Sequence, residues 1–459
     1  DGKHDEKGLR LAMNEEAVIE QLTEKQTELI EFLYVDYNGL TRGKVIPLAS
    51  LKAKLADGIG LTKATLNVSE RDTMLPVQDM TPIGELRLVG DPASAHVLPY
   101  MPQVATLMGD IYNLDKTPYA SDPRSILKRV VEQLADAGFS VKMTYENEFE
   151  LFAGDKDHRE PAMPRVAFST ESMDFAYPFI LKAINQLQQV GIMPNAYYPE
   201  GGIGQHELSM LPQDPVTAAD NEVIYKRIIK NTAKNFDLYA SFAPKPLVDS
   251  AGSGAHIHFS LWQDQKDAFF DDDAPMHLSQ TGQYFVGGIL KHIQGLLALT
   301  CPSVNSYQRL APGHWSSAYA TYGQDNREAA VRIPSTAWSD PASSMNIELK
   351  ASDATANPYL AFAGLLAAGL DGITHQLQPG DYCDVDPASL SDAERAAKGI
   401  RRLPRTLGQA VDAFVADPLF QDLFGAQLVD AYAKIKREDD HYYGKLELEK
   451  IAALHRELY

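Results

Sequence analysis

Four short segments constrain the fold most, because in each of them polar and apolar side chains alternate at every second residue. The first runs from Val141 to Phe152 and carries Glu146, Glu148 and Glu150. Side chains of a strand point to opposite faces in turn, so these carboxylates share one face at intervals of about 7 Å. Like charges at that spacing cost free energy unless water or cations offset them. Taken alone, the run is typical of a strand face exposed to water.

Three further segments repeat the pattern and change its interpretation. They are Gln205–Met210, His256–Leu261 and Asn346–Lys350. Their polar faces carry, in chain order, Gln205, Glu207 and Ser209, then His256, His258 and Ser260, then Asn346, Glu348 and Lys350. Glu200 precedes the first of them, and we expect a bend at Gly201-Gly202 to bring it close to Glu207. Four strands that turn carboxylates or imidazoles to one side predict a shared polar cavity in a partly open barrel.

The donors on these strands favour a hard divalent metal. Carboxylate oxygens with an imidazole suit Mg²⁺ or Mn²⁺ better than zinc, since there is neither a thiolate set nor an HEXXH motif. Arg309, Arg327 and Arg332 add positive charge suited to phosphate oxygens or to a substrate carboxylate. Carboxylates with divalent metals, facing arginines, are the parts that phosphoryl transfer requires. The chain has no GXXXXGK[ST] loop, which excludes a P-loop mechanism.

The rest of the chain predicts an α+β fold in two domains. Residues Glu15–Glu31 read as a helix, and Phe32–Pro47 as two strands joined by a turn at Asn38-Gly39. We expect a small first domain over residues 14–115 and a large second one over 116–459. Because the second part lacks a regular strand-helix alternation, we expect an antiparallel sheet with helices outside it.

Composition excludes several partners. The chain has 62 acidic against 42 basic residues, a formal charge of -20 that repels nucleic acid and anionic membrane surfaces. The two cysteines, Cys301 and Cys383, have no metal-ligand spacing, which suits a reducing compartment. No apolar stretch is long enough to cross a bilayer. We expect a cytoplasmic protein that binds neither nucleic acid nor membranes.

The motifs resemble those of the glutamine synthetase family over essentially the whole chain. They are Tyr145-Glu146-Asn147-Glu148-Phe149, Glu200 with Gly204-Gln205-His206-Glu207, Gly252-Ser253-Gly254-Ala255-His256-Ile257-His258, Asn305-Ser306-Tyr307-Gln308-Arg309-Leu310, Asn326-Arg327 to Arg332-Ile333-Pro334, and Asn357-Pro358-Tyr359-Leu360. The resemblance implies an N-terminal β-grasp domain followed by a catalytic domain with a curved antiparallel sheet and surrounding helices. It also implies a ligase dependent on ATP and on Mg²⁺ or Mn²⁺ that forms γ-glutamyl phosphate. Such a chain is expected to form a homo-oligomer, a dodecamer of two stacked hexameric rings with each site between subunits.

The resemblance also implies a role for each matched residue. One metal would be held by Glu148, Glu200 and Glu207, and the second, beside the γ-phosphate, by Glu146, His256 and Glu348. Nucleotide contacts would come from Glu207, His258, Ser260 and Arg332. Arg327 and Arg332 would act as catalytic residues on the transferring phosphoryl group.

Substrate binding is implied for four positions. Gly252 and Arg309 would hold glutamate, Arg309 by its α-carboxylate. Lys350 stands where the family has a substrate-binding arginine, and lysine keeps the charge but loses the bidentate fork. Trp315 follows the arginine loop where glutamine synthetases that use ammonia carry a glutamate that binds ammonium.

The missing acids predict a different acceptor. A second family acid, from a neighbour's F-D-G-S-S motif, has no counterpart in the segment Gly58–Ala64. Apolar surface contributes about 25 cal/mol per Å² buried, and ammonia has none to bury. Trp315 therefore favours an organic amine, so that the chain is similar to the γ-glutamylpolyamine and γ-glutamylamide synthetases of amine catabolism.

Several alternatives stay open from the sequence. Trp315 is also compatible with a repacked site that still uses ammonia, and a non-catalytic relative is a third possibility, against which the intact metal set argues. Trp315 serves either as a cation-π platform or as an apolar wall, so monoamines are not separated from diamines and polyamines. The sequence does not identify the base that deprotonates the amine, for which Asp325 is one nearby ionisable candidate.

Overall fold

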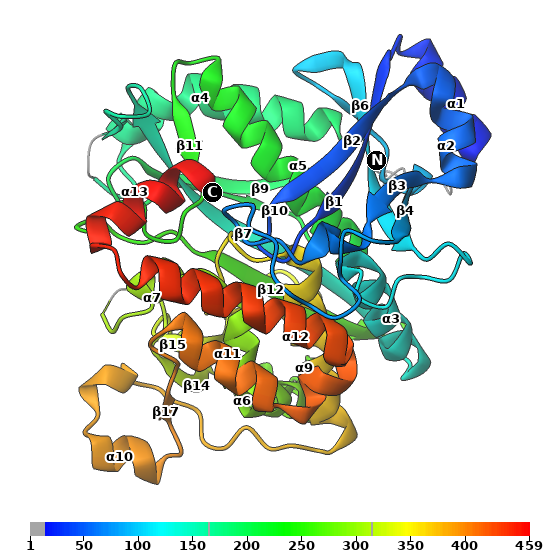
Figure 1. Cartoon of the computed structure of the whole chain (residues 1–459). Coiled ribbons are helices and arrows are strands. Elements are labelled where there is room, and N and C mark those ends of the chain that lie inside the picture. The colour runs from blue at the N-terminus through cyan, green and yellow to red at the C-terminus, as the bar shows by residue number, and fades with distance from the viewer. Residues whose placement is uncertain (1–13, 164–165, 314) are drawn as a thin grey trace, which may run out of the picture.

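The computed structural model describes residues 14–163, 166–313 and 315–459, and within them the chain forms two sheets and a set of helices (Figure 1). Residues 29–112 supply the strands of a six-stranded sheet, and residues 140–402 those of an eleven-stranded sheet. The fold is of the α+β class, as predicted. Among the described residues, no helix combines the length and apolar character that a bilayer crossing requires.

The N-terminal sheet has the strand order β2-β1-β6-β4-β3, with β5 paired to β6. Its elements are α1 (Glu15–Glu24), β1 (Leu29–Val35), β2 (Thr41–Pro47), α2 (Leu51–Asp57), β3 (Ile59–Thr62), β4 (Glu85–Gly90), β5 (His96–Leu98) and β6 (Met101–Tyr112). The first helix ends at Glu24 and not at Glu31 as predicted. The reason is that Gln26 adopts a φ of 57° and Leu29 already pairs with β2 and β6.

The large sheet has the order β17-β14-β15-β16-β12-β7-β10-β9. Its strands are β7 (Ser140–Ala153), β8 (Glu160–Pro161), β9 (Pro194–Pro199), β10 (Gln205–Met210), β11 (Tyr239–Ser241), β12 (Ala255–Gln263), β13 (Lys266–Asp267), β14 (Tyr319–Gln324), β15 (Ala329–Ile333), β16 (Ile347–Leu349) and β17 (Arg401–Arg402). The predicted antiparallel arrangement holds except for β14 and β15, which run parallel. The loop after Gln324 leads the chain back along β14, so that Ala329 pairs with Tyr319.

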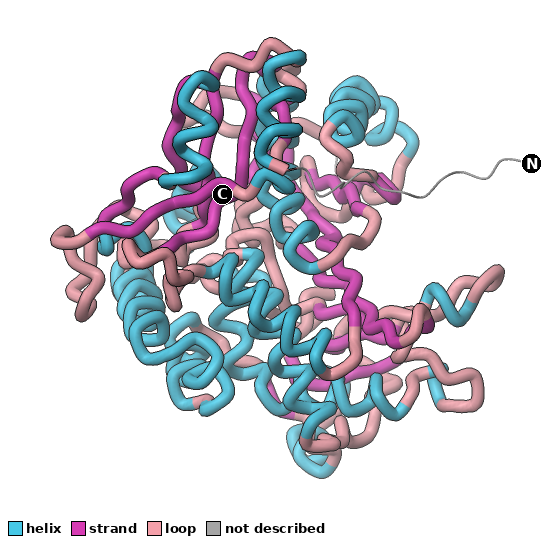
Figure 2. Tube along the Cα trace, turned by 90° about the vertical axis from the view of Figure 1, so that its right-hand side faces the viewer, coloured by secondary structure: helices cyan, strands magenta, loops and turns pink. Residues whose placement is uncertain are grey.

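Helices cover this sheet. They are α3 (Pro123–Asp136), α4 (Thr170–Gln189), α5 (Pro215–Lys234), α6 (Gln280–Thr300), α7 (Ser306–Arg309), α8 (Pro341–Ser344), α9 (Pro358–Thr374), α10 (Asp392–Ala397), α11 (Leu407–Ala416), α12 (Pro418–Tyr443) and α13 (Leu448–Leu458). In Figure 2 the lower part of the molecule is mostly helical, whereas strands run through the upper part. The apolar face of β7 packs on this layer, where the ring of Tyr145 stacks on Phe362 of α9 at 4.8 Å.

Asn357 is one of the side chains that join the two parts of the chain. Asn357 caps α9, since its side-chain oxygen accepts hydrogen bonds from the backbone N–H groups of Tyr359 and Leu360 at 3.0 and 3.1 Å. Its amide nitrogen donates in the other direction, to the carbonyl oxygens of Val35 and Asp36 at 3.2 and 3.0 Å. The helix start predicted at Asn357-Pro358 is therefore confirmed, and it is bonded to the end of β1.

Candidate metal and nucleotide site

Strand register gathers the polar groups. β7 lies between β12 and β10, which puts Glu146 opposite His256 and Glu148 opposite Glu207. On the other edge of β12, Glu348 of β16 lies opposite His258. The shared polar face predicted from the four alternating segments is therefore present.

The first cluster consists of Glu148, Glu200 and Glu207, whose ligand atoms lie within 4.8 Å of one another. Burial, followed by the charge of Glu200, raises the pKa of Glu148 to about 7. Burial, followed by the charge of Glu146, raises the pKa of Glu207 to about 11. Three crowded carboxylates with raised pKa values lack positive charge, which a divalent cation would supply.

Two residues that the sequence analysis left without a role orient this cluster. Gln205 donates from its amide nitrogen to Glu148 Oε2 at 3.0 Å and to the carbonyl oxygen of Gly252 at 2.9 Å. The hydroxyl of Tyr198 donates to Glu207 Oε1. Gln205 lay on a predicted polar face, whereas nothing in the sequence pattern marked Tyr198.

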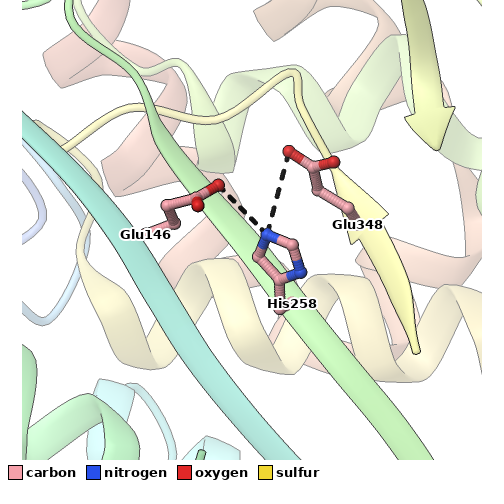
Figure 3. A group of neighbouring side chains, drawn as sticks. All are labelled: Glu146, His258 and Glu348. Atoms are coloured by element: carbon pink, nitrogen blue, oxygen red, sulfur yellow. Dashed lines mark hydrogen bonds and ion pairs between the residues drawn. The ribbon is translucent and has the colours of Figure 1, made fainter. Parts of the chain in front are cut away.

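The second cluster consists of Glu146, His258 and Glu348, which point toward one another from three strands (Figure 3). Nε2 of His258 lies 3.2 Å from Glu146 Oε2 and 3.8 Å from Glu348 Oε1. His256, the predicted ligand, approaches the same oxygens, since its Nδ1 lies 3.5 Å from Glu146 Oε2 and 3.2 Å from Glu348 Oε1. Both imidazoles therefore lie within reach of one position between the two carboxylates.

Positive groups surround this second cluster. Burial opposes the charge of Glu146, but hydrogen bonds from His256 and His258 outweigh it and hold the pKa of that carboxyl far below its usual range. Burial likewise opposes the charge of Glu348, yet Lys350, the two histidines and Arg332 lower its pKa to about 2. Arg332 Nη1 lies 2.8 Å from Glu348 Oε2, and Lys350 Nζ lies 3.6 Å from Oε1.

The donor set fits divalent metal ions. Glu348 is buried, and among the described residues its Oε1 atom has no hydrogen-bond partner. An unsatisfied buried carboxylate oxygen is rare unless an ion or water completes it. The other donors are carboxylate oxygens and imidazole nitrogens, with no thiolate near them, which suits Mg²⁺ or Mn²⁺.

A cavity of about 510 Å³ adjoins the second cluster. Glu146, His258 and Ser260 line it, as do Lys142 and Trp262 farther along β7 and β12. Ser260 accepts a hydrogen bond from Trp262 Nε1 at 2.8 Å, and Lys142 Nζ lies 4.3 Å from the centre of the indole ring. His258 and Ser260, predicted to contact the nucleotide, thus line one cavity of a size suited to a nucleotide.

The arginines differ in their surroundings. Arg309 is buried with Nη2 2.9 Å from the carbonyl oxygen of Ser352, and among the described residues its Nε atom has no partner. A Cβ atom at Gly252 would collide with Cγ of Arg309, so only glycine allows this approach. Arg327 is exposed, and its side chain forms no ion pair within the described part of the chain, in contrast to Arg332.

The loops beside the clusters hold a carboxylate that the sequence analysis missed. Trp315 is 60% exposed, and its backbone N–H donates to Glu328 Oε1 at 2.9 Å. Glu328 follows Arg327 directly, but only the folded loops show that it reaches Trp315. Asp325, the predicted base, instead accepts hydrogen bonds from the backbone N–H and the hydroxyl of Ser335.

Comparison with known proteins finds one family over nearly the whole chain. The model of the glutamine synthetase catalytic domain matches residues 120–451, and that of the glutamine synthetase N-terminal domain matches residues 13–119. The glutamine synthetase of Methanosarcina mazei is 33% identical over 443 residues, which cover 95% of this chain and 96% of the relative. That of Pyrococcus abyssi is 33% identical over 425 residues, covering 92% of each chain.

Solved structures show the same fold. The crystal structure of a novel glutamine synthase homolog superposes with a TM-score of 0.85 at 32% identity, covering 94% of this chain and 99% of that one. GmaS in complex with ADP superposes with a TM-score of 0.83 at 30% identity, covering 94% and 97%. The chain belongs to the glutamine synthetase family, whose members are ATP-dependent ligases that form carbon–nitrogen bonds and use divalent metal ions.

Proposed function

We propose that this member of the glutamine synthetase family joins the γ-carboxylate of L-glutamate to an organic amine, through γ-glutamyl phosphate. The acceptor is an alkyl monoamine, a diamine or a polyamine. The observation that carries the proposal is the exposed tryptophan at position 315, where a glutamine synthetase that uses ammonia carries an ammonium-binding glutamate. The clusters of carboxylates and histidines support the first, ATP-dependent step, which forms γ-glutamyl phosphate. Trp315 supports an organic amine as the acceptor in the second step.

We assign the two clusters to two metal ions. Glu148, Glu200 and Glu207 would hold one, and Glu146 and Glu348 would hold the other with His256, while His258 faces the nucleotide. When bound, these ions would neutralise phosphate charge and position the γ-phosphate.

The protein's cationic side chains would bind the anionic parts of the substrates. Arg332 would bind the transferring phosphoryl group, because its pairing with Glu348 already directs it toward the second cluster. Arg327 would join it there, since its exposed side chain is not held by another residue of the described chain. Arg309, with one nitrogen unpaired, would take the α-carboxylate of glutamate, and Lys350 would add positive charge beside it.

Trp315 would favour an acceptor that carries an alkyl chain over ammonia. Its side chain is 60% exposed, so apolar surface is available for an alkyl chain to cover. Each Å² of apolar surface buried contributes about 25 cal/mol, and ammonia gains nothing from it. A charged distal amine could also lie over the indole face.

Glu328 would accept the proton of the amine, in place of Asp325. An amine arrives as an ammonium ion and must lose a proton before its nitrogen attacks. Burial disfavours the charge of Asp325, but the hydrogen bonds from Ser335 outweigh it and lower the pKa, which weakens Asp325 as a base. Glu328 uses one oxygen for Trp315 N–H, and its other oxygen is not engaged by any described residue. The amine nitrogen would then bond to the γ-carbonyl carbon as phosphate leaves and Glu328 takes the proton.

The remaining assignments follow from family membership and stay proposals. We propose a dodecamer of two stacked hexameric rings, domain bounds of 14–115 and 116–459, a cytoplasmic location and a role in amine catabolism. Glutamate and ATP are the substrates of the family, and its members typically form oligomers.

An amine panel tests the proposal. ADP release is measured with glutamate, ATP and Mg²⁺, in turn with ammonia, short alkylamines, diamines and polyamines. We expect at least one organic amine to exceed ammonia in kcat/KM by about tenfold or more, the factor that ~1.4 kcal/mol of differential binding provides. Turnover with ammonia alone would identify a glutamine synthetase with an altered ammonium site. Absence of both ATP and metal binding would identify a non-catalytic relative.

A further inference from the structure

A second cavity lies away from the metal clusters, between the N-terminal sheet and α5. It measures about 450 Å³, and its walls come from β1, β2 and the turn between them, from α5, and from the last residues of the chain. Figure 1 shows the blue strands β1 and β2 beside the green helix α5. It shares no lining residue with the cavity at Glu146 and His258, so it is a separate site.

Positive charge dominates this cavity. The acidic side chain that lines it is Glu31, and the basic ones are Arg42, Lys44, Lys226, Arg227, Lys230 and Lys234. The whole chain carries a net charge of -20. Cations crowded in one cavity repel one another and cost free energy unless an anion offsets them, even on a chain that is acidic overall.

The two arginines already have partners. Arg227 pairs with both carboxylate oxygens of Glu31, one of them at 2.9 Å. Arg42 pairs with Asp36 at 2.6 Å and with Asp72 at 2.8 Å. Both guanidinium forks are therefore occupied by carboxylates.

Of the lysines, Lys226 has a carboxylate partner, whereas the others that line the cavity do not pair with a carboxylate within the described part of the chain. Lys226 lies 3.0 Å from the carbonyl oxygen of Ala354 and 3.7 Å from Glu222. Lys44 donates to the carbonyl oxygen of Gly60. Lys230 and Lys234 have no carboxylate within 4.0 Å in the described part of the chain. Burial, followed by the charges of Lys226 and Lys234, lowers the pKa of Lys230 to about 8, the direction expected where cations crowd one another.

We propose that this lysine cavity binds a small molecule that carries one or more phosphate groups. Lysine ammonium groups act as point charges that suit tetrahedral phosphate, whereas a planar carboxylate is matched by a free arginine fork, and both forks here are taken. Leu33, Val223 and Phe242 add an apolar wall for an organic part of the ligand. The site goes beyond the ligase reaction. It is connected to that reaction structurally, because α5 packs against β7, the strand that carries Glu146 and Glu148.

Metal-free titration calorimetry with inorganic tripolyphosphate tests the site. EDTA removes divalent ions that would otherwise chelate tripolyphosphate or bridge it to the carboxylate clusters, and the paired variants below show whether the lysine cavity is the binding site. We expect saturable binding of one tripolyphosphate per chain. Lys230→Ala with Lys234→Ala should weaken it at least tenfold. The matched control, Lys52→Ala with Lys182→Ala, removes the same charge from two exposed lysines of α2 and α4 and should change the affinity less than twofold.

A second arm distinguishes the source of the phosphate. AMP, titrated under the same conditions, binds more tightly than tripolyphosphate if the apolar wall receives an organic part, and more weakly if the site takes inorganic polyphosphate.

Three results would overturn the proposal: no saturable heat with either probe, equal loss of affinity in the two double variants, or unchanged affinity in the Lys230/Lys234 variant. Size-exclusion chromatography adds a fourth. In this outcome, the Lys230→Ala/Lys234→Ala variant elutes as a smaller species than both the wild-type protein and the control variant, and the wild-type protein binds neither probe. The cavity is then an interface with a second copy of the chain.

Discussion

The metal clusters and the loops that carry Trp315 and Glu328 are neighbours built in opposite ways. The clusters stand on central strands, where Glu146 and Glu348 are each contacted by two histidines. Trp315 stands on a loop, is 60% exposed and is bound to Glu328 by one backbone hydrogen bond. On the proposed function, the buried clusters would carry the chemistry common to the family, and the exposed loops would carry the choice of acceptor. Substitutions in the clusters should therefore lower the rate with every acceptor, whereas substitutions in the loops should affect only some acceptors.

The largest effect should come from the clusters. Glu146→Gln removes the charge of a proposed metal ligand, so kcat/KM should fall by about 10³-fold or more, or ~4 kcal/mol, with every acceptor. Glu150→Gln is the matched control on the same strand. Burial raises the pKa of Glu150 well above its usual range, and glutamine keeps the size of its side chain. ADP release measures both variants. Equal losses in the two would show that the strand, and not the ligand, is what matters.

A smaller and more selective effect should follow in the acceptor loop. Glu328→Gln should lower kcat/KM for the preferred amine by about 10²-fold, at the lower end for a lost general base. Hydroxylamine is mostly unprotonated at neutral pH, so its rate should change little. The KM values for glutamate and ATP should also stay the same.

Asp325→Asn is the competing variant, measured with the same amine and with hydroxylamine. If it reproduces the selective loss and Glu328→Gln does not, the proton goes to Asp325, the candidate named from the sequence.

Trp315→Ala should have a weaker effect, confined to the carbon chain of the acceptor. Loss of about 50–60 Å² of apolar contact corresponds to ~1.4 kcal/mol, or about tenfold in kcat/KM, for an alkylamine. The rate with ammonia should not fall. A series of alkylamines of increasing length measures the effect, and a slope against chain length that is unchanged in the variant would remove Trp315 from the acceptor site.

The smallest effect should fall on stability alone, at His292 of α6. Burial opposes its protonation, but hydrogen bonds to Asp417 at 2.6 Å and Asp371 at 2.9 Å outweigh it and raise its pKa above 6.5. A raised folded-state pKa contributes stability that is complete below pH 6.5 and is lost as the pH rises through the folded value.

His292→Asn should therefore cost about 1–2 kcal/mol below that pH and less in alkaline buffer. Urea unfolding at both pH values measures it, and kcat/KM with any acceptor should not change. A cost that grows with pH would contradict this assignment.

The two regions also differ in how far the sequence predicts them. The period of two is a local property, so the alternation of side chains is enough to identify the strands that carry Glu146, Glu207 and His256. Contacts between loops follow no periodic pattern, so the sequence does not predict the contact of Glu328 with Trp315. It also does not resolve which imidazole lies nearer the second cluster, because His256 and His258 share one face and differ only in tertiary surroundings.

Errors in the fold have the same origin. The helix from Glu15 stops at Glu24 because the next residues enter a sheet whose partner, β6, lies far along the chain. The parallel pairing of β14 with β15 depends on the path of one loop, for which no periodic pattern exists. By contrast, the helix start at Asn357-Pro358 is predicted correctly, since a helix cap is encoded within a few residues.

The hydrogen bonds of Asn357 to both α9 and β1 affect how the protein unfolds. Its side-chain carbonyl oxygen is used by α9 and its amide nitrogen by β1, so a single side chain must both accept and donate. Aspartate only accepts, and serine is too short to span both groups. The loss of either partner exposes the other, so Asn357 adds to the coupling of the N-terminal sheet to the catalytic helices that the pair of Glu31 and Arg227 also provides. Heating should then give a single calorimetric transition, and Asn357→Asp should lower its midpoint.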